Sequence, residues 1–200
     1  MWPPGADTAT RKRDNSAMAF HHVALATRDT AATHHFYTEL MGFELVKVVV
    51  APTPGEHGGW AKHFFYATNP AVSRDEQLMA FWELHDEQIG ADYNVNLNKA
   101  IGLPAFVNHF AFDAASLDVL HEHRDRWRSH GHTVAEVDHD FCVSIYTTDP
   151  NGNLVEFCHT TRPFPDEERQ RATDVLLDSS PALDESRAQM TIWEPLVPVA

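Results

Sequence analysis

Basic residues are scarce in this chain, with 15 lysines and arginines against 29 aspartates and glutamates, and the formal net charge is −14. Nucleic-acid backbones and anionic membrane surfaces would repel such a chain, so we expect neither as a partner. Only two cysteines occur, Cys142 and Cys158. No apolar run approaches the roughly 20 residues that cross a bilayer, and the polar first residues lack the apolar core of an export signal. We therefore expect a cytoplasmic protein with both thiols free.

Histidine, by contrast, is abundant: fourteen are spread along the 200 residues. Histidine is the commonest metal ligand among the side chains, which directs attention to where these residues fall. The chain is long enough for one well-buried domain or for two small modules that share a core.

A repeat organises the middle of the chain. Each copy opens with an apolar strand carrying a histidine, His22 or His109, and a helix N-cap, Asp29 or Ser116, follows seven residues later. A helical stretch then ends at a glycine. Strand-like runs are expected at residues 20–26, 44–50, 62–67 and 77–84 in the first copy and at 106–112, 133–137, 142–147 and 153–159 in the second. Each copy therefore predicts a βαβββ module.

The predicted fold class is α+β, with the sheets of two βαβββ modules joined around a shared metal-containing cavity, because one module alone leaves a sheet face uncovered. We expect the modules at residues 18–90 and 104–162. The polar residues 1–17 predict a disordered arm. The acidic, proline-punctuated residues 163–200 predict an irregular extension that wraps the domain or a partner subunit, with Trp193 and Leu196 as candidates to dock it.

Alternation along the strands predicts which side chains face the cavity. His22 and His109 point away from the helices in their strands. Glu156 stands among large apolar residues, where an unpaired buried charge would be costly, and Glu83 has the same expected placement in the first copy. Two imidazoles and one or two carboxylates suit Fe(II), Mn(II), Ni(II), Co(II) or Zn(II). Glu83 could instead be an exposed strand residue or a substrate contact. Histidines on the helices, among them His123, are expected to be solvated.

Three sequence segments carry a family resemblance: HHVAL opens the first copy, VNHFAF opens the second and DPNGNLVEF closes it. In this order they resemble the vicinal oxygen chelate superfamily, which includes glyoxalase I, extradiol dioxygenases, methylmalonyl-CoA epimerase and fosfomycin-resistance proteins. The resemblance covers residues 18–162. It implies a divalent metal held by His22, His109 and Glu156, a small-molecule substrate and a homodimer. The cavity forms within one chain or from modules exchanged between subunits, since relatives do both.

A narrower match to extradiol dioxygenases runs from His139 through Tyr146 and the segment Asp149-Pro150-Asn151-Gly152 to Glu156. The match implies that His139 lies beside bound substrate and oxygen and that Tyr146 hydrogen-bonds a metal-bound oxygen of the substrate. The Asp149 segment is also a turn sequence, which explains much of the motif without function.

Two departures from the extradiol pattern concern the first module and the chain's size. Ring-cleaving relatives usually carry a further acid–base histidine where this chain has Tyr66, with His63 nearby, so both become candidate substrate contacts. Many relatives also have two additional modules. Glu83, as a fourth ligand or a base, would complete the ligand set of glyoxalase I.

The sequence therefore predicts an Fe(II)-dependent, ring-cleaving extradiol-type dioxygenase that acts on a small catecholic substrate. One alternative is a glyoxalase- or epimerase-like isomerase or lyase, in which Glu83 or Glu156 moves a proton. Another is a non-catalytic protein that binds a drug or metabolite in the same cavity.

Overall fold

The computed structural model describes residues 20–53, 58–183 and 188–197. The arm predicted at residues 1–17 lies outside the described residues. Within them, no helix has the length and apolar character needed to cross a membrane.

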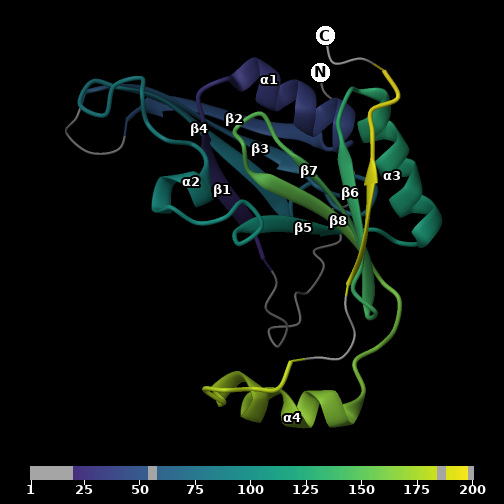
Figure 1. The fold of residues 1–200 in the computed structure, drawn as a ribbon. Helices are drawn as coiled ribbons and strands as arrows, with labels where there is room; N and C mark the ends of the chain where they lie inside the picture. Colours follow the sequence, from purple (N-terminus) through teal and green to yellow (C-terminus); the bar gives the residue numbers. More distant parts are fainter. Residues whose placement is uncertain (1–19, 54–57, 184–187, 198–200) are drawn as a thin grey trace, which may run out of the picture.

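The first module is a four-stranded sheet covered on one face by a short helix (Figure 1). Its order of elements is β1 (His22–Thr27), α1 (Thr30–His35), the π-helical turn η1 (Phe36–Leu40), β2 (Glu44–Pro52), β3 (Gly59–Ala67) and β4 (Leu78–Asp86). The strands lie in the order β1-β4-β3-β2, with β1 parallel to β4. Asp29 caps α1 by accepting a hydrogen bond from the Ala32 amide at 2.9 Å. The helical stretch ends at Gly42, whose φ of 77° a residue with a side chain rarely adopts.

The second module repeats this plan. After the connecting helix α2 (Leu97–Ile101) come β5 (His109–Asp113), α3 (Leu117–Ser129), β6 (Val134–Asp138), β7 (Cys142–Thr148) and β8 (Leu154–Thr160). Ser116 caps α3 through the Val119 amide at 3.2 Å. The sheet order β5-β8-β7-β6 matches that of the first module, and β5 runs parallel to β8. The predicted α+β fold of two βαβββ modules is confirmed.

The helix-facing sides of both sheets share one core. Phe81 of the first sheet and Ile145 of the second are fully buried, as is Trp127 of α3. Two polar contacts tie the modules together inside this core: the Trp127 indole donates to the Leu40 carbonyl at 3.2 Å, and the Tyr37 hydroxyl donates to Asp149 at 3.0 Å. The first sheet therefore packs on the second through its helices.

The turn at Asp149 is a structural element of this interface. Its carboxylate accepts hydrogen bonds from the backbone amides of Asn151 and Asn153 at 2.9 and 2.8 Å. Burial raises the pKa of Asp149 although these bonds and the one from Tyr37 favour its charged form. The Asp149 part of the extradiol-like motif therefore has a packing role.

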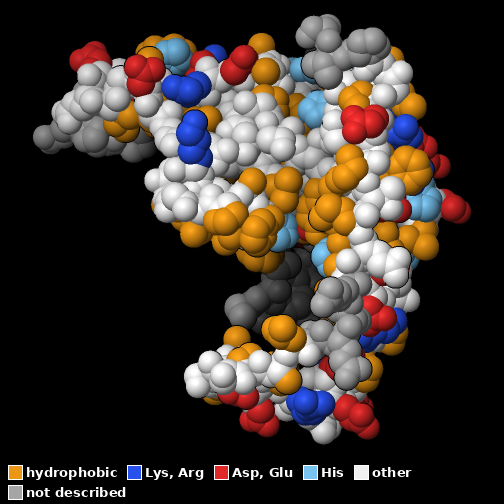
Figure 2. All heavy atoms as spheres, in the orientation of Figure 1, with side chains coloured by type: hydrophobic (Ala, Val, Ile, Leu, Met, Phe, Trp, Pro, Cys, Tyr) orange, Lys and Arg blue, Asp and Glu red, His pale blue; other side chains and the backbone are white. Residues whose placement is uncertain are grey.

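The C-terminal extension leaves the body and returns to it. Helix α4 (Asp166–Leu177) has no buried residue and stands apart from the rest of the molecule (Figure 1). Strand β9 (Gln189–Trp193) then pairs antiparallel with β6 and extends the second sheet. Trp193 docks as predicted, since the guanidinium groups of Arg124 and Arg128 lie 4.3 and 5.2 Å from its ring. Figure 2 shows a hollow between α4 and the body, with hydrophobic side chains on the face of the body that borders it.

Candidate metal centre

Four predicted site residues meet on the open face of the second sheet, the face away from α3. His109 Nε2 lies 3.2 Å from Glu156 Oε2. Tyr146 is the cross-strand neighbour of Glu156 in β7, and its hydroxyl oxygen lies 3.1 Å from His139 Nε2. Strands β5, β7 and β8 keep the alternation expected from the sequence, and this places the side chains on one face.

His109 and Glu156 fit two ligands of one ion. The Phe106 carbonyl lies 3.0 Å from His109 Nδ1 and orients the ring so that Nε2 faces Glu156. Metal–ligand bonds of roughly 2.1 Å at right angles place two donor atoms about 3 Å apart, which the 3.2 Å spacing approaches. Glu156 is only 4% exposed, and a buried carboxylate needs a partner of opposite charge.

Tyr146 belongs to the same group electrostatically. Burial, aided by the negative charge of Glu156, raises the pKa of Tyr146 to about 12. Its hydroxyl therefore keeps its proton at neutral pH and is available as a donor.

His22 lies on the open face of the first sheet, as alternation predicts, and it is exposed. Its neighbours are His21, whose Nδ1 lies 2.8 Å from the Nδ1 of His22, and the rings of His63 and Phe65 at 6.3 and 5.6 Å between centroids. Across the described ranges, no three His, Cys, Asp or Glu side chains lie close enough to hold one ion. A single chain thus brings His109 and Glu156 together, and it does not add His22 to them.

Glu83 is not where the sequence placed it. In β4 it pairs with Lys62 of β3, and Lys62 Nζ lies 2.7 Å from Glu83 Oε2. Burial disfavours its charge, but hydrogen bonds from Lys62 and His85 lower the pKa of Glu83. Because side chains alternate along a strand, Glu83 lies on the same side of β4 as the buried Met79 and Phe81. It therefore points toward the helix side of the sheet, whereas His22 points to the open side. The expected equivalence with Glu156 is therefore corrected.

The two candidate substrate contacts in β3 lie on opposite faces. Tyr66 is fully buried in the core and its hydroxyl contacts His34 Nδ1 at 3.1 Å, so its expected place beside a substrate is also corrected. His63 is on the open face near His22, where it stacks on Trp82 with ring centroids 3.9 Å apart.

His123, expected from the sequence to be solvated, is half-buried in the structure. His123 stacks on Phe157 with ring centroids 3.8 Å apart. The spacing Leu120, His123, Trp127 places all three on one face of α3, and this periodicity was the available signal.

The comparisons with known proteins bear on this fold and site. The sequence model of the Glyoxalase/Bleomycin resistance protein/Dioxygenase superfamily matches residues 19–157. The chain belongs to this superfamily. The predicted family is thereby confirmed. A comparison with curated protein sequences gives no significant match.

Solved structures similar to this chain are found at low sequence identity. A glyoxylase/bleomycin resistance protein/dioxygenase domain from Frankia sp. EAN1pec is 13% identical with a TM-score of 0.51, covering 72% of this chain and 99% of that one. A lactoylglutathione lyase from Agrobacterium tumefaciens is 23% identical with a TM-score of 0.45, covering 72% of this chain and 95% of that one. The fosfomycin resistance protein FosX from Listeria monocytogenes is 17% identical with a TM-score of 0.48, covering 76% and 98%. Members of this superfamily typically bind divalent metals and small molecules and form dimers.

Proposed function

We propose that this superfamily member is an Fe(II)-dependent, ring-cleaving extradiol-type dioxygenase acting on a small catecholic substrate. The observation that supports it best is the continuous group His109, Glu156, Tyr146 and His139 on one sheet face. Glu83 faces the other side of its own sheet, so one carboxylate accompanies the two proposed histidine ligands. This ratio is the 2-His-1-carboxylate set that favours non-haem iron.

The side chains beside the proposed ligands match the chemistry of a catechol. When bound, Fe(II) with two histidines and one carboxylate supplies redox activity and open coordination positions. The Tyr146 hydroxyl can donate a hydrogen bond to a substrate oxyanion. His139 Nε2, 3.1 Å from that hydroxyl, can accept or return a proton at the same oxygen.

The proposed metal centre lies between two copies of the chain. His22 of one copy would join His109 and Glu156 of the other, because the described part of one chain brings together only the last two. Both open sheet faces carry exposed ligand candidates, and a twofold dimer would complete two equal centres. The proposed partner is therefore a second copy of this chain.

Oxygen uptake tests the proposal. The chain is loaded with Fe(II) under anaerobic conditions and mixed with a panel of catechols, and we expect oxygen consumption with at least one of them. Glu156→Gln should lose iron and uptake together. Glu83→Gln is the matched control, because it makes the same change in the last strand of the other module and should retain both.

Two results would contradict this assignment. Loaded protein that consumes no oxygen with any catechol removes the dioxygenase proposal. Retention of Ni, Co or Zn in place of iron, with loss of that metal in Glu83→Gln, would favour the isomerase or lyase alternative.

A further inference from the structure

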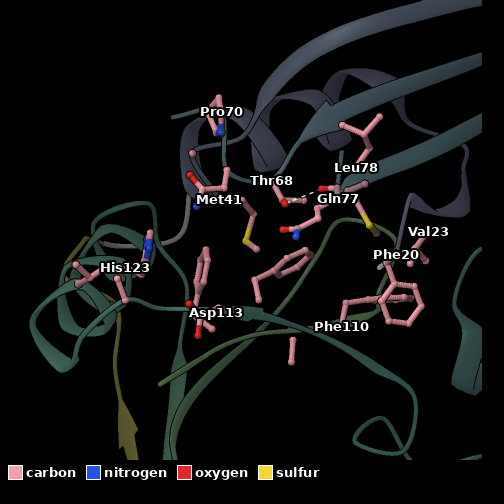
Figure 3. A pocket seen from close by; sticks show the side chains of 18 of the residues that line it. Phe20, Val23, Met41, Thr68, Pro70, Gln77, Leu78, Phe110, Asp113 and His123 are labelled. Atoms are coloured by element: carbon pink, nitrogen blue, oxygen red, sulfur yellow. Dashed lines mark hydrogen bonds between the residues drawn. The ribbon is translucent and has the colours of Figure 1, made fainter. Parts of the chain in front are cut away.

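A cavity of about 920 Å³ lies between the two modules. The first module contributes the turn after η1 and the ends of β3 and β4, and the second contributes β5 and α3. Figure 3 shows His123 and Asp113 toward one end, and Phe20, Val23 and Phe110 toward the other. This volume is within the range of pockets that enclose small organic molecules, roughly 300–1,000 Å³.

Most of the cavity wall is apolar. Met41, Leu78 and Met79 line it from the first module, and Phe112, Val119 and Phe157 line it from the second. A ligand that fills this space must present an apolar body to these side chains, because polar groups without partners lose free energy there.

Arg126 is the one arginine or lysine of the described residues that lines the cavity. Burial lowers its pKa, and its Nε atom is buried without a hydrogen-bond partner. Nη2 donates to Nδ1 of His123. In the described part of the chain, Arg126 forms no ion pair, and Glu122, whose charge acts on it, lies one turn earlier on α3. A half-buried guanidinium whose Nε–H group has no partner favours a bound anion.

Neither His123 nor Gly42, which both lie against the guanidinium, neutralises its charge. Burial and the charge of Arg126 lower the pKa of His123 to about 4, so the imidazole accepts a hydrogen bond but carries no charge at neutral pH. Gly42 leaves space on the other side: a Cβ atom built there would lie 3.2 Å from Arg126 Nη1. The guanidinium thus lies against a residue without a side chain.

The Arg126 end of the cavity is distinct from the proposed metal centre. Strand β5 passes along the wall from His109 to Asp113, and five residues span about 13 Å of strand. Phe110, next to His109 in β5, lies toward one end of the cavity, and Asp113 and His123 lie toward the other (Figure 3). An anion beside Arg126 is therefore about a strand length from the His109 imidazole.

We propose that the cavity between the modules binds a small monocarboxylate with an apolar body, whose carboxylate pairs with Arg126. A single guanidinium balances one negative charge, and a dianion would leave a second charge in an apolar space. A planar carboxylate also matches the geometry of the guanidinium edge. The inference goes beyond the proposed dioxygenase, since it needs neither the metal nor a catechol.

Calorimetric titration of the full chain tests this inference with 1-naphthaleneacetate and its neutral isostere 1-naphthaleneacetamide as probes. We expect the carboxylate to bind about tenfold or more tightly than the amide, because hydrogen bonds to charged groups are the stronger ones. Arg126→Gln should remove this preference, because the glutamine carries no charge that favours the carboxylate over the amide. Arg171→Gln, which removes the same charge from exposed α4, should leave the preference intact.

Two further measurements distinguish carboxylate binding in this cavity from effects of misfolding and of the metal. Methyl NMR of the unaltered protein should show shifts at Met41 and Val119 on adding the carboxylate, which needs no variant. Titration with and without Fe(II) should give the same affinity. Equal affinity for the two probes, or carboxylate binding that depends on Fe(II), would overturn the inference, and neither result bears on oxygen uptake with catechols.

Discussion

Ala80 occupies in the first sheet the register position that Glu156 occupies in the second. Each is paired in parallel with the alanine that follows the strand histidine by two residues, Ala24 for Ala80 and Ala111 for Glu156. The two parallel strand pairs are therefore equivalent in register but differ in the side chains that they present. One module offers a histidine, the other a histidine and a carboxylate, and their sum is the ligand set on which the proposed function rests.

Tyr146→Phe tests the role of the phenol beside this ligand set. The change removes the hydroxyl that lies 3.1 Å from His139 and leaves His109 and Glu156 in place. We expect iron content to be retained and kcat for the best catechol to fall by roughly 10²–10³, the usual cost of losing one donor to a developing oxyanion. Steady-state oxygen uptake measures this, and an unchanged kcat would show that Tyr146 serves only packing.

The lowered pKa of His123 predicts that the free energy of unfolding depends on pH. Because burial and Arg126 lower its folded pKa to about 4 from the usual 6.5, the unfolded chain takes up a proton first as the pH falls. The contribution of the neutral, packed His123 to the free energy of unfolding is present above pH 6.5 and is lost as the pH falls toward 4. Allowing for solvent screening, it amounts to about 1–2 kcal/mol.

Urea unfolding of the wild type and His123→Gln at about pH 7 and about pH 4.5 measures this contribution. The wild type should lose more free energy of unfolding than the variant does. His35→Gln, which changes an exposed histidine of α1, is the control and should behave as the wild type. An identical loss in all three proteins would contradict the assignment to His123.

Trp193→Ala tests whether β9 holds the C-terminal extension on the second sheet. The change removes the ring against which Arg124 and Arg128 lie, and we expect a loss of about 2 kcal/mol in the free energy of unfolding. Leu176→Ala on α4, where the side chain is 81% exposed, should change it by less than about 0.5 kcal/mol. Equal effects of the two changes would show that β9 does not anchor the C-terminal extension to the second sheet.

Much of the fold could be predicted from local sequence. The N-caps at Asp29 and Ser116 and the alternation in β1 and β5 involve neighbouring residues only. The pairing of β9 with β6 is different, because the sequence of β9 does not specify which sheet edge it will meet.

The candidate site was predictable where strand parity was certain and not elsewhere. Glu156 follows two apolar residues, and the side of the sheet that each faces can be predicted. Strand β4 is uniformly apolar up to Glu83, so only its register with β1 in the structure shows which side Glu83 faces. Tyr66 became a candidate through a family pattern, but it lies on the same side of β3 as the buried Phe64 and so faces the core. His123 was expected in solvent and Arg126 was not singled out, because only the packing of the first module against α3 encloses them.

Metal content of a mixed dimer tests the central claim most directly. Differently tagged His22→Ala and Glu156→Ala chains are co-expressed, and the dimer carrying both tags is isolated and loaded with Fe(II). If each centre takes His22 from one copy and His109 with Glu156 from the other, the mixed dimer keeps one intact centre and should bind about half the iron of the wild-type dimer. Each variant alone should bind essentially none. A mixed dimer as empty as its parents, beside a fully loaded wild type, would contradict the shared centre.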